Sequence, residues 1–298
     1  MIVWLASYPR SGSLLLRQIL YFTMNQPSYH LGSDVNEING EYSRQIDGPL
    51  EEFVAQSAGA RHPVLIKTHH HPSDQHPALY VVRDGRAAIA SFLKFERTFS
   101  PDEQTTMLRL VVGDHYFGGW SEHYAAWHDR SQVPTILTLR YEALVDASAE
   151  LLARIAAFIG YRGEIAPWVN PIEEWRARHP GIVGPGKRTW EPPREWTHVC
   201  DAIFWAMHGE LMKQLGLDDG DRVAAPSDAV ACALGEIVPL MSAAVARIRR
   251  LQEDCVAKEA VISELFRVCA ERESAIKRLL ADASTRAPLV EEMRQRRT

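Results

Sequence analysis

Short apolar runs recur along the first half of the chain, and a polar or cationic residue follows each of them closely. Four such runs predict buried strands, at residues 2–6, 64–66, 78–82 and 135–139. Apolar residues at helical spacing predict helices at residues 14–24, 87–95, 148–159 and 201–215. Strands that alternate with helices predict an α/β domain in three layers, with helices on both faces of a parallel sheet. Ligands bind such sheets beyond the carboxyl ends of the strands, where the polar residues of this chain lie.

The character of the chain changes after residue 216. Residues 217–228 are polar and rich in turn-forming residues, so we predict a linker at 221–235. This linker separates a domain at residues 1–220 from a tail at 236–298. The domain is long enough to form one sizeable core, and the tail is an appendage of it.

Apolar residues of the tail recur at alternating steps of three and four between Ile248 and Leu279, over more than four heptads. That spacing predicts a helical coiled coil. A fourteen-residue segment that begins at Leu251 also returns from Leu265. We therefore expect a homo-oligomer, or a partner protein bound through this tail. Two cations in the seam weaken a simple dimer, so an antiparallel hairpin, docking onto another protein and packing on the chain's own domain remain open.

Composition narrows the class of protein. The chain is 46% hydrophobic and 24% charged, which is typical of a globular protein. Its net charge of -5 argues against a broad surface for nucleic acids, though not against a local basic pocket. The first residues lack the basic segment of a secretory signal, and no apolar stretch reaches the ~18 residues of a membrane span. Four cysteines show no metal-ligand spacing, so we expect a cytoplasmic protein with free thiols and no metal requirement.

The segment SYPRSGS, from Ser7 to Ser13, lies between a predicted strand and a predicted helix. Backbone amides at the start of a helix attract anions, and small residues such as Ser11 and Gly12 let a phosphate approach them. Arg10 adds a forked cation that suits oxyanions. No lysine follows Gly12, so the segment does not fit the pattern G-x-x-x-x-G-K-[ST] of loops that bind ATP or GTP. Taken alone, such a turn is also compatible with a simple helix cap.

Four segments together resemble a known family. SYPRSGS, from Ser7, is similar to the loop T/S-Y-P-K/R-S-G-T/N-T-W of sulfotransferases that use 3'-phosphoadenosine 5'-phosphosulfate (PAPS). RDGRAAIAS, from Arg83, resembles their 3'-phosphate motif R-D/N-x-x-D-x-x-x-S. KTH at Lys67 and RYEAL at Arg140 resemble the segment of the catalytic histidine and the R-Y-E-D-L segment. The four matches occur in family order within residues 1–216, and the chain is similar to the bacterial type of this family.

The resemblance implies a P-loop-like α/β fold and transfer of a sulfuryl group from PAPS to an acceptor hydroxyl, with adenosine 3',5'-bisphosphate (PAP) as the second product. It makes His69 the general base, Arg10 the group that stabilises the leaving phosphate, and Lys67 a helper that positions the sulfuryl oxygens. The other donor-binding residues that it implies are Ser11, Gly12, Ser13, Leu14, Arg83, Ser91, Tyr141, Lys187 and Arg188. We expect a small molecule, a carbohydrate or a glycan intermediate as the acceptor. Aromatic residues at 116–127 fit either an acceptor platform or the core.

Departures from the family pattern keep other functions open. Leu14 and Leu15 replace the usual Thr and Trp, which removes a phosphate-binding hydroxyl and the aromatic residue that stacks on adenine. A small-molecule kinase that uses ATP and magnesium is one alternative. A degenerate nucleotide-binding scaffold whose coiled coil mediates assembly is another. The adjacent histidines at residues 69–71 are weak candidates for a metal site, because three neighbours on a regular strand cannot converge on one ion.

Overall fold

The computed structural model of the protein divides the chain into two compact units, Met1–Val245 and Ala246–Thr298. The described residues are 1–31, 42–57, 59–60, 62–99, 105–129, 131, 133, 135–178, 190–221 and scattered positions between 238 and 272. Nearly all of the predicted linker and coiled-coil tail lie outside them. The boundaries at residues 220 and 235, and the coiled coil itself, therefore stay predictions.

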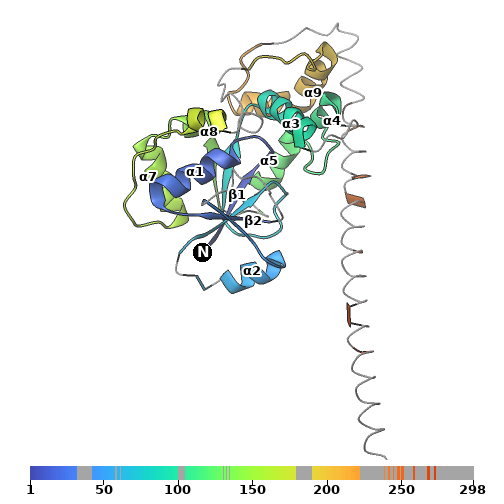
Figure 1. The fold of residues 1–298 in the computed structure, drawn as a ribbon. Coiled ribbons are helices and arrows are strands. Elements are labelled where there is room, and N and C mark those ends of the chain that lie inside the picture. Colours follow the sequence, from blue (N-terminus) through green and yellow to red (C-terminus); the bar gives the residue numbers. More distant parts are fainter. Residues whose placement is uncertain are drawn as a thin grey trace, which may run out of the picture. The chain divides into compact units, whose positions relative to one another are not determined.

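A parallel sheet in the order β3-β2-β4-β1-β5-β6 forms the middle of the first unit (Figure 1). Its strands are β1 (Ile2–Ser7), β2 (Ser28–His30), β3 (Ser43–Gln45), β4 (Val64–Thr68), β5 (Ala78–Val82) and β6 (Ile136–Arg140). Because every paired strand runs in the same direction, their carboxyl ends meet at one edge. β1 lies between β4 and β5, so the residues that follow these three strands are neighbours.

Alternate side chains of β1 serve two separate cores. Val3 and Leu5 pack on one face of the sheet, and Trp4 and Ala6 pack on the other. The first face is covered by α1 (Ser13–Met24), α6 (Tyr141–Val145) and α7 (Ala149–Ile159). The second is covered by α2 (Leu50–Ser57), α3 (Gly85–Phe99), α4 (Met107–Val111), α5 (Trp120–His128) and α9 (His198–Gln214). The predicted three-layer α/β arrangement is confirmed.

The four predicted strands and four predicted helices are present, with ends that differ by a few residues. Helix α3 begins at Gly85, two residues before the predicted start, because Asp84 caps it. The Asp84 carboxylate accepts from the Arg86 amide at 2.8 Å, and its carbonyl oxygen accepts from the Ala88 amide at 2.9 Å. Sequence reasoning missed the strands β2 and β3, since each has only three residues, too few to give a measurable periodicity.

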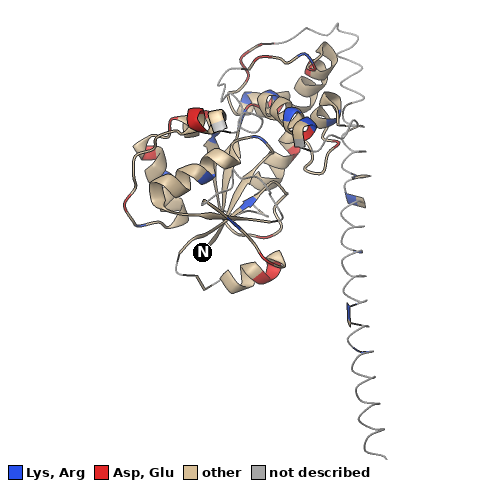
Figure 2. Cartoon of the chain, viewed as in Figure 1, with Lys and Arg blue, Asp and Glu red and all other residues tan. Residues whose placement is uncertain are grey.

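Charged side chains are unevenly distributed over the described elements (Figure 2). Acidic residues occupy the first turns of α2 and of α8 (Ile172–Arg178), whereas the last turns of α3 and α4 carry basic residues. The overall charge of -5 is therefore compatible with locally basic surroundings. Among the described helices, none is both long and apolar enough to cross a membrane.

Candidate functional site

The loop between β1 and α1 makes a tight turn beside the carboxyl edge of the sheet. The Ser11 amide donates to the Tyr8 carbonyl oxygen at 3.2 Å, and Gly12 caps α1 with a φ of 114°. A Cβ atom on Gly12 would lie 2.7 Å from Cδ2 of Tyr141, so this position requires glycine for space as well as for backbone conformation. The first turn of α1 contains no acidic residue, which leaves its amides suited to an anion.

Arg10 has the unusual backbone of this loop. Its φ is 65°, a left-handed conformation that non-glycine residues adopt rarely and at a cost of about 1 kcal/mol or more. Its Nε donates to Oγ of Ser91 at 3.3 Å, and its guanidinium carbon lies 4.9 Å from the centre of the Phe95 ring. Both partners lie on α3. The strained loop therefore holds the Arg10 side chain against a helix that follows a different strand.

Arg83 approaches the same loop from the end of β5. Its Nη1 donates to the Arg10 carbonyl oxygen at 3.3 Å, and its guanidinium lies 4.4 Å from the centre of the Tyr141 ring. Burial, together with the nearby charge of Arg83, lowers the pKa of Arg10 to about 10. Arg10 is thus still protonated at neutral pH. Two arginines that approach each other in this way create a local positive potential, which favours an anionic ligand.

The remaining loop residues offer groups that a phosphate can use. Ser11 is 1% exposed, and its hydroxyl has no hydrogen-bond partner among the described residues. Ser13 and Leu14 begin α1 and are partly buried. Leu14 has no polar side chain and can contribute only its amide. A buried hydroxyl without a partner is rare, and here it lies in the turn that would receive the anion.

His69 directly follows β4, next to the end of β1. Its Nδ1 lies 2.7 Å from the carbonyl oxygen of Ser7 and 3.3 Å from the Ser7 hydroxyl. A carbonyl oxygen only accepts, so Nδ1 carries the proton and the Nε2 atom of the neutral ring is the basic nitrogen. The structure gives Nε2 no hydrogen bond from the described residues. The ring therefore has the tautomer that a general base needs.

The surroundings of His69 keep its ring neutral. Burial and the charge of Lys67 hold the pKa of His69 well below its usual value. Lys67 lies two residues earlier on β4, pairs in register with Leu5 and is partly buried. His123 supports the backbone, since its Nε2 donates to the His69 carbonyl oxygen at 2.9 Å while its Nδ1 lies 2.9 Å from the Tyr80 hydroxyl.

Four of the predicted residues thus contact one another directly: Arg10, Arg83, Ser91 and Tyr141. His69 and Lys67 lie at the end of the neighbouring strand β4. Lys187 and Arg188 lie outside the described residues. Their proposed roles, and that of Tyr141 as an adenine contact, stay predictions.

The aromatic residues at 116–127 divide between core and surface. Trp120, His123 and Trp127 are buried, the two tryptophans on the sheet face that α3, α4, α5 and α9 cover, whereas Tyr116 is 65% exposed. The Phe117 ring lies between these extremes, 5.8 Å from the ring of His69. Among the described residues, no group of three or more His, Cys, Asp or Glu side chains is arranged to hold a metal ion.

Sequence reasoning overlooked several residues that the structure connects to this site. Ser7 fixes the tautomer of His69, and Phe95 covers the Arg10 guanidinium. Ser7 belongs to the phosphate-loop segment, but its carbonyl group has no sequence signal. Phe95 lies four residues after Ser91 on α3, so helical spacing from the 3'-phosphate motif was the one signal that pointed to it.

Comparison with known proteins finds similarity to sulfotransferases. The family described as Sulfotransferase domain matches residues 2–174. Sulfotransferase 4A1 of Mus musculus is 25% identical over 190 residues, 57% of this chain and 64% of that protein. The 3-alpha-hydroxysteroid sulfotransferase of Cavia porcellus is 24% identical over 163 residues, 52% of this chain and 57% of that protein. The match thus spans less than two thirds of each of these curated relatives. The crystal structure of mouse sulfotransferase SULT7A1 complexed with PAP is 16% identical, with a TM-score of 0.47 and coverage of 79% of this chain and 87% of that chain.

Proposed function

The chain belongs to the sulfotransferase domain family, and from that premise we propose that it transfers a sulfuryl group from PAPS to an acceptor hydroxyl. One observation carries the proposal: Arg10, Arg83 and Ser91 meet at the ends of β1 and β5, while His69 lies at the adjoining end of β4. This arrangement supplies cations for a donor with two anionic groups and a neutral base for an acceptor.

The residues present fit the two anionic ends of PAPS. Arg10, the amides at the start of α1 and the buried Ser11 hydroxyl suit the 5'-phosphosulfate. Arg83 and Ser91 suit the 3'-phosphate. The glycine at position 12 leaves the space in front of Tyr141 that a side chain would fill. Binding of the anionic donor would also reduce the electrostatic repulsion between Arg10 and Arg83.

The proposed reaction needs one base and one electrostatic stabiliser. The acceptor oxygen forms a bond to sulfur, the bond from sulfur to the phosphate oxygen breaks, and PAP leaves with the electron pair. His69 takes the acceptor proton at Nε2, while Arg10 stabilises the negative charge on the leaving phosphate. Arg10 does not donate a proton in this scheme, because its pKa of about 10 keeps the guanidinium charged.

The proposal also covers the acceptor, the remaining donor contacts and the assembly of the chain. The acceptor is a hydroxyl compound, with a carbohydrate or glycan intermediate as the sequence-based expectation. Phe117, whose ring centre lies 5.8 Å from that of His69, packs against it in this proposal. Tyr141 contacts the adenine, and Lys187 and Arg188 complete the 3'-phosphate site. The chain acts in the cytoplasm and assembles through its tail, with itself or with a partner protein.

Ligand-dependent stabilisation of the full chain tests the donor assignment. PAP at ~100 times its dissociation constant should raise the free energy of unfolding by about 2.7 kcal/mol without added metal. ATP and 5'-AMP should give clearly smaller shifts. Equal stabilisation by ATP, or a requirement for magnesium with ATP, would instead support the small-molecule kinase.

Turnover with radiolabelled PAPS and a panel of hydroxyl acceptors then tests the chemistry. His69→Ala should lower the rate by about 10²-fold to 10⁴-fold while PAP stabilisation persists. Loss of PAP binding in that variant would show that His69 acts in donor binding. Absence of any PAP binding by the unmodified chain would reject the proposed function and favour the scaffold.

A further inference from the structure

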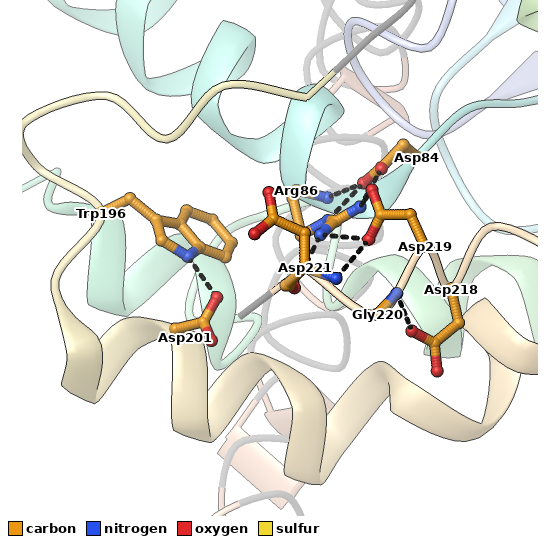
Figure 3. A network of polar contacts seen from close by, with 8 residues as sticks. All are labelled: Asp84, Arg86, Trp196, Asp201, Asp218, Asp219, Gly220 and Asp221. Atoms are coloured by element: carbon orange, nitrogen blue, oxygen red, sulfur yellow. Dashed lines mark hydrogen bonds and ion pairs between the residues drawn. The ribbon is translucent and has the colours of Figure 1, made fainter. Parts of the chain in front are cut away.

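Arg86 belongs to the segment from Arg83 to Ser91 and is the centre of a buried network of polar contacts (Figure 3). Its side chain is 0% exposed. Its Nη2 donates to Oδ2 of Asp84 at 2.7 Å and to Oδ2 of Asp219 at 2.9 Å, and its Nη1 donates to the Asp221 carbonyl oxygen at 3.3 Å. The guanidinium is also within 5.5 Å of the Trp190 ring centre and 5.2 Å of the Trp205 ring centre. We name these contacts the Arg86 clamp.

The positive charge of Arg86 interacts with the carboxylates of Asp84 and Asp219 inside this clamp. Burial lowers the pKa of Arg86, but hydrogen bonds and charge from Asp84 and Asp219 outweigh that effect and raise it above its usual value. Nε of Arg86 also donates to Oδ1 of Asp84 at 3.2 Å, so both carboxylate oxygens of Asp84 are bound by one guanidinium. Such a bidentate pair is geometrically specific.

Asp84 makes this clamp relevant to the donor site, because it directly follows Arg83 in the chain. Without Arg86, the Asp84 carboxylate would be an uncompensated negative charge one residue along the chain from Arg83, the arginine that is assigned to the 3'-phosphate. We propose that Arg86 is a positioning residue that neutralises Asp84 and thereby preserves the preference of the site for a ligand with a 3'-phosphate. This inference rests on the proposed function, since it concerns the same donor site.

The clamp also fixes elements that carry donor-binding residues. Asp84 caps α3, on which Ser91 and Phe95 contact Arg10. At the other side of the guanidinium, Asp219 belongs to the segment that follows α9, 133 residues further along the chain. Loss of Asp219 alone would open this second half of the clamp and leave Asp84 bound to Arg86. The two halves can therefore be separated by mutation.

The affinities of the full chain for PAP and 5'-AMP, measured by calorimetry, test the proposal. 5'-AMP lacks the 3'-phosphate, so the ratio of the two affinities reports on that group alone. Arg86→Met should reduce the ratio about tenfold, the scale of a charge–charge interaction that is partly screened by distance and solvent. The double variant Asp84→Asn/Arg86→Met should restore the ratio to within about threefold of the unmodified chain, since the uncompensated charge is gone.

Asp219→Asn is the matched control and should keep the ratio, because Asp84 remains neutralised. If Arg86→Met does not fold, Arg86→Gln carries the same test, with and without Asp84→Asn, since glutamine also removes the positive charge but keeps a hydrogen-bond donor for the carboxylates. Equal loss of PAP and 5'-AMP affinity, or no restoration by Asp84→Asn, would overturn the inference. If the unmodified chain does not bind PAP, the proposed function fails first and the inference fails with it.

Discussion

Arg83 and Arg86 are three residues apart in the sequence, yet their surroundings are electrostatically opposite. Arg83 lies over the ring of Tyr141 and donates to the backbone of Arg10, whose own pKa it helps to lower. Arg86 is enclosed by two carboxylates and two tryptophan rings. The turn that starts α3 directs the two side chains into these different regions.

The different surroundings of Arg83 and Arg86 indicate different roles for the two side chains. A buried arginine that is paired with carboxylates of its own chain contributes to the fold, and its compensated charge does not attract a ligand. Two arginines that lie close together repel each other, destabilise the free protein slightly and gain from an incoming anion. The strained φ of 65° at Arg10 supports this view, because such strain tends to persist at functional sites.

The largest expected effect comes from opening the clamp. Arg86→Met should lower the free energy of unfolding by about 3 kcal/mol, because it leaves two carboxylates without their buried partner. Arg83→Met should change stability by less than about 1 kcal/mol, since it also removes a charge that opposes Arg10. Urea unfolding with an unchanged denaturant slope measures both values. Similar losses in the two variants would contradict the contrast between the regions.

The second effect is the loss of donor binding when Arg83 is replaced. Arg83→Met should weaken PAP binding by about 10-fold to 100-fold, the scale of a charge-assisted hydrogen bond. Arg97→Met is a matched control, because Arg97 lies on α3 but forms an exposed ion pair with Glu195 at 2.7 Å. Calorimetry should show unchanged PAP affinity for this control. An equal loss in both variants would mean that net charge, and not the site, governs binding.

Much of the sheet could be predicted from the sequence because its strands are buried on both faces. Continuous apolar runs such as residues 2–6 and 78–82 are typical of such strands, and each is followed closely by polar residues. β2 and β3 escaped detection, since they are short and contain mostly polar residues. The tail shows the opposite situation, a strong heptad pattern in a region that is mostly outside the described residues.

The site could be predicted only where its residues belong to local patterns. The phosphate loop and the segment from Arg83 to Ser91 were found because fixed spacing identifies them. The sequence did not reveal that Arg86 pairs with Asp219, because that carboxylate is 133 residues further along the chain. Side-chain pairs of this kind depend on how separate elements pack, and local periodicity carries no information about them.

A smaller effect should follow from filling the space between the loop and Tyr141. Gly12→Ala combines an unfavourable φ with a contact of 2.7 Å to the ring on which Arg83 lies, so unfolding should become easier by about 2 kcal/mol. Gly216→Ala is its control, with a φ of 62° and no atom within 4 Å, and should lose only ~1 kcal/mol. PAP affinity should fall in the first variant alone, whereas equal behaviour of the two would show that the Tyr141 contact is unimportant.

The smallest expected effect concerns protons, and it extends the contrast to His69. Its pKa is lowered by burial and then by the charge of Lys67, much as Arg83 acts on Arg10. A base must be unprotonated to act, and a lowered pKa keeps it so to lower pH. The rate of sulfuryl transfer should therefore stay constant from pH 8 to 6.5 and fall only in more acidic solution, as the ring takes up its proton.

Replacement of the neighbouring charge tests the cause of that shift. Lys67→Met removes a charge that lowers the pKa of His69. The acidic limb of the pH profile of kcat/KM should therefore move toward higher pH by about one pKa unit or less, the scale of one partly screened charge. Arg86→Lys should leave the limb in place, because lysine keeps the positive charge that faces the two carboxylates of the clamp. If the limb does not move in Lys67→Met, burial alone sets the pKa of His69. A limb that moves equally in both variants would show that the clamp is electrostatically coupled to the base.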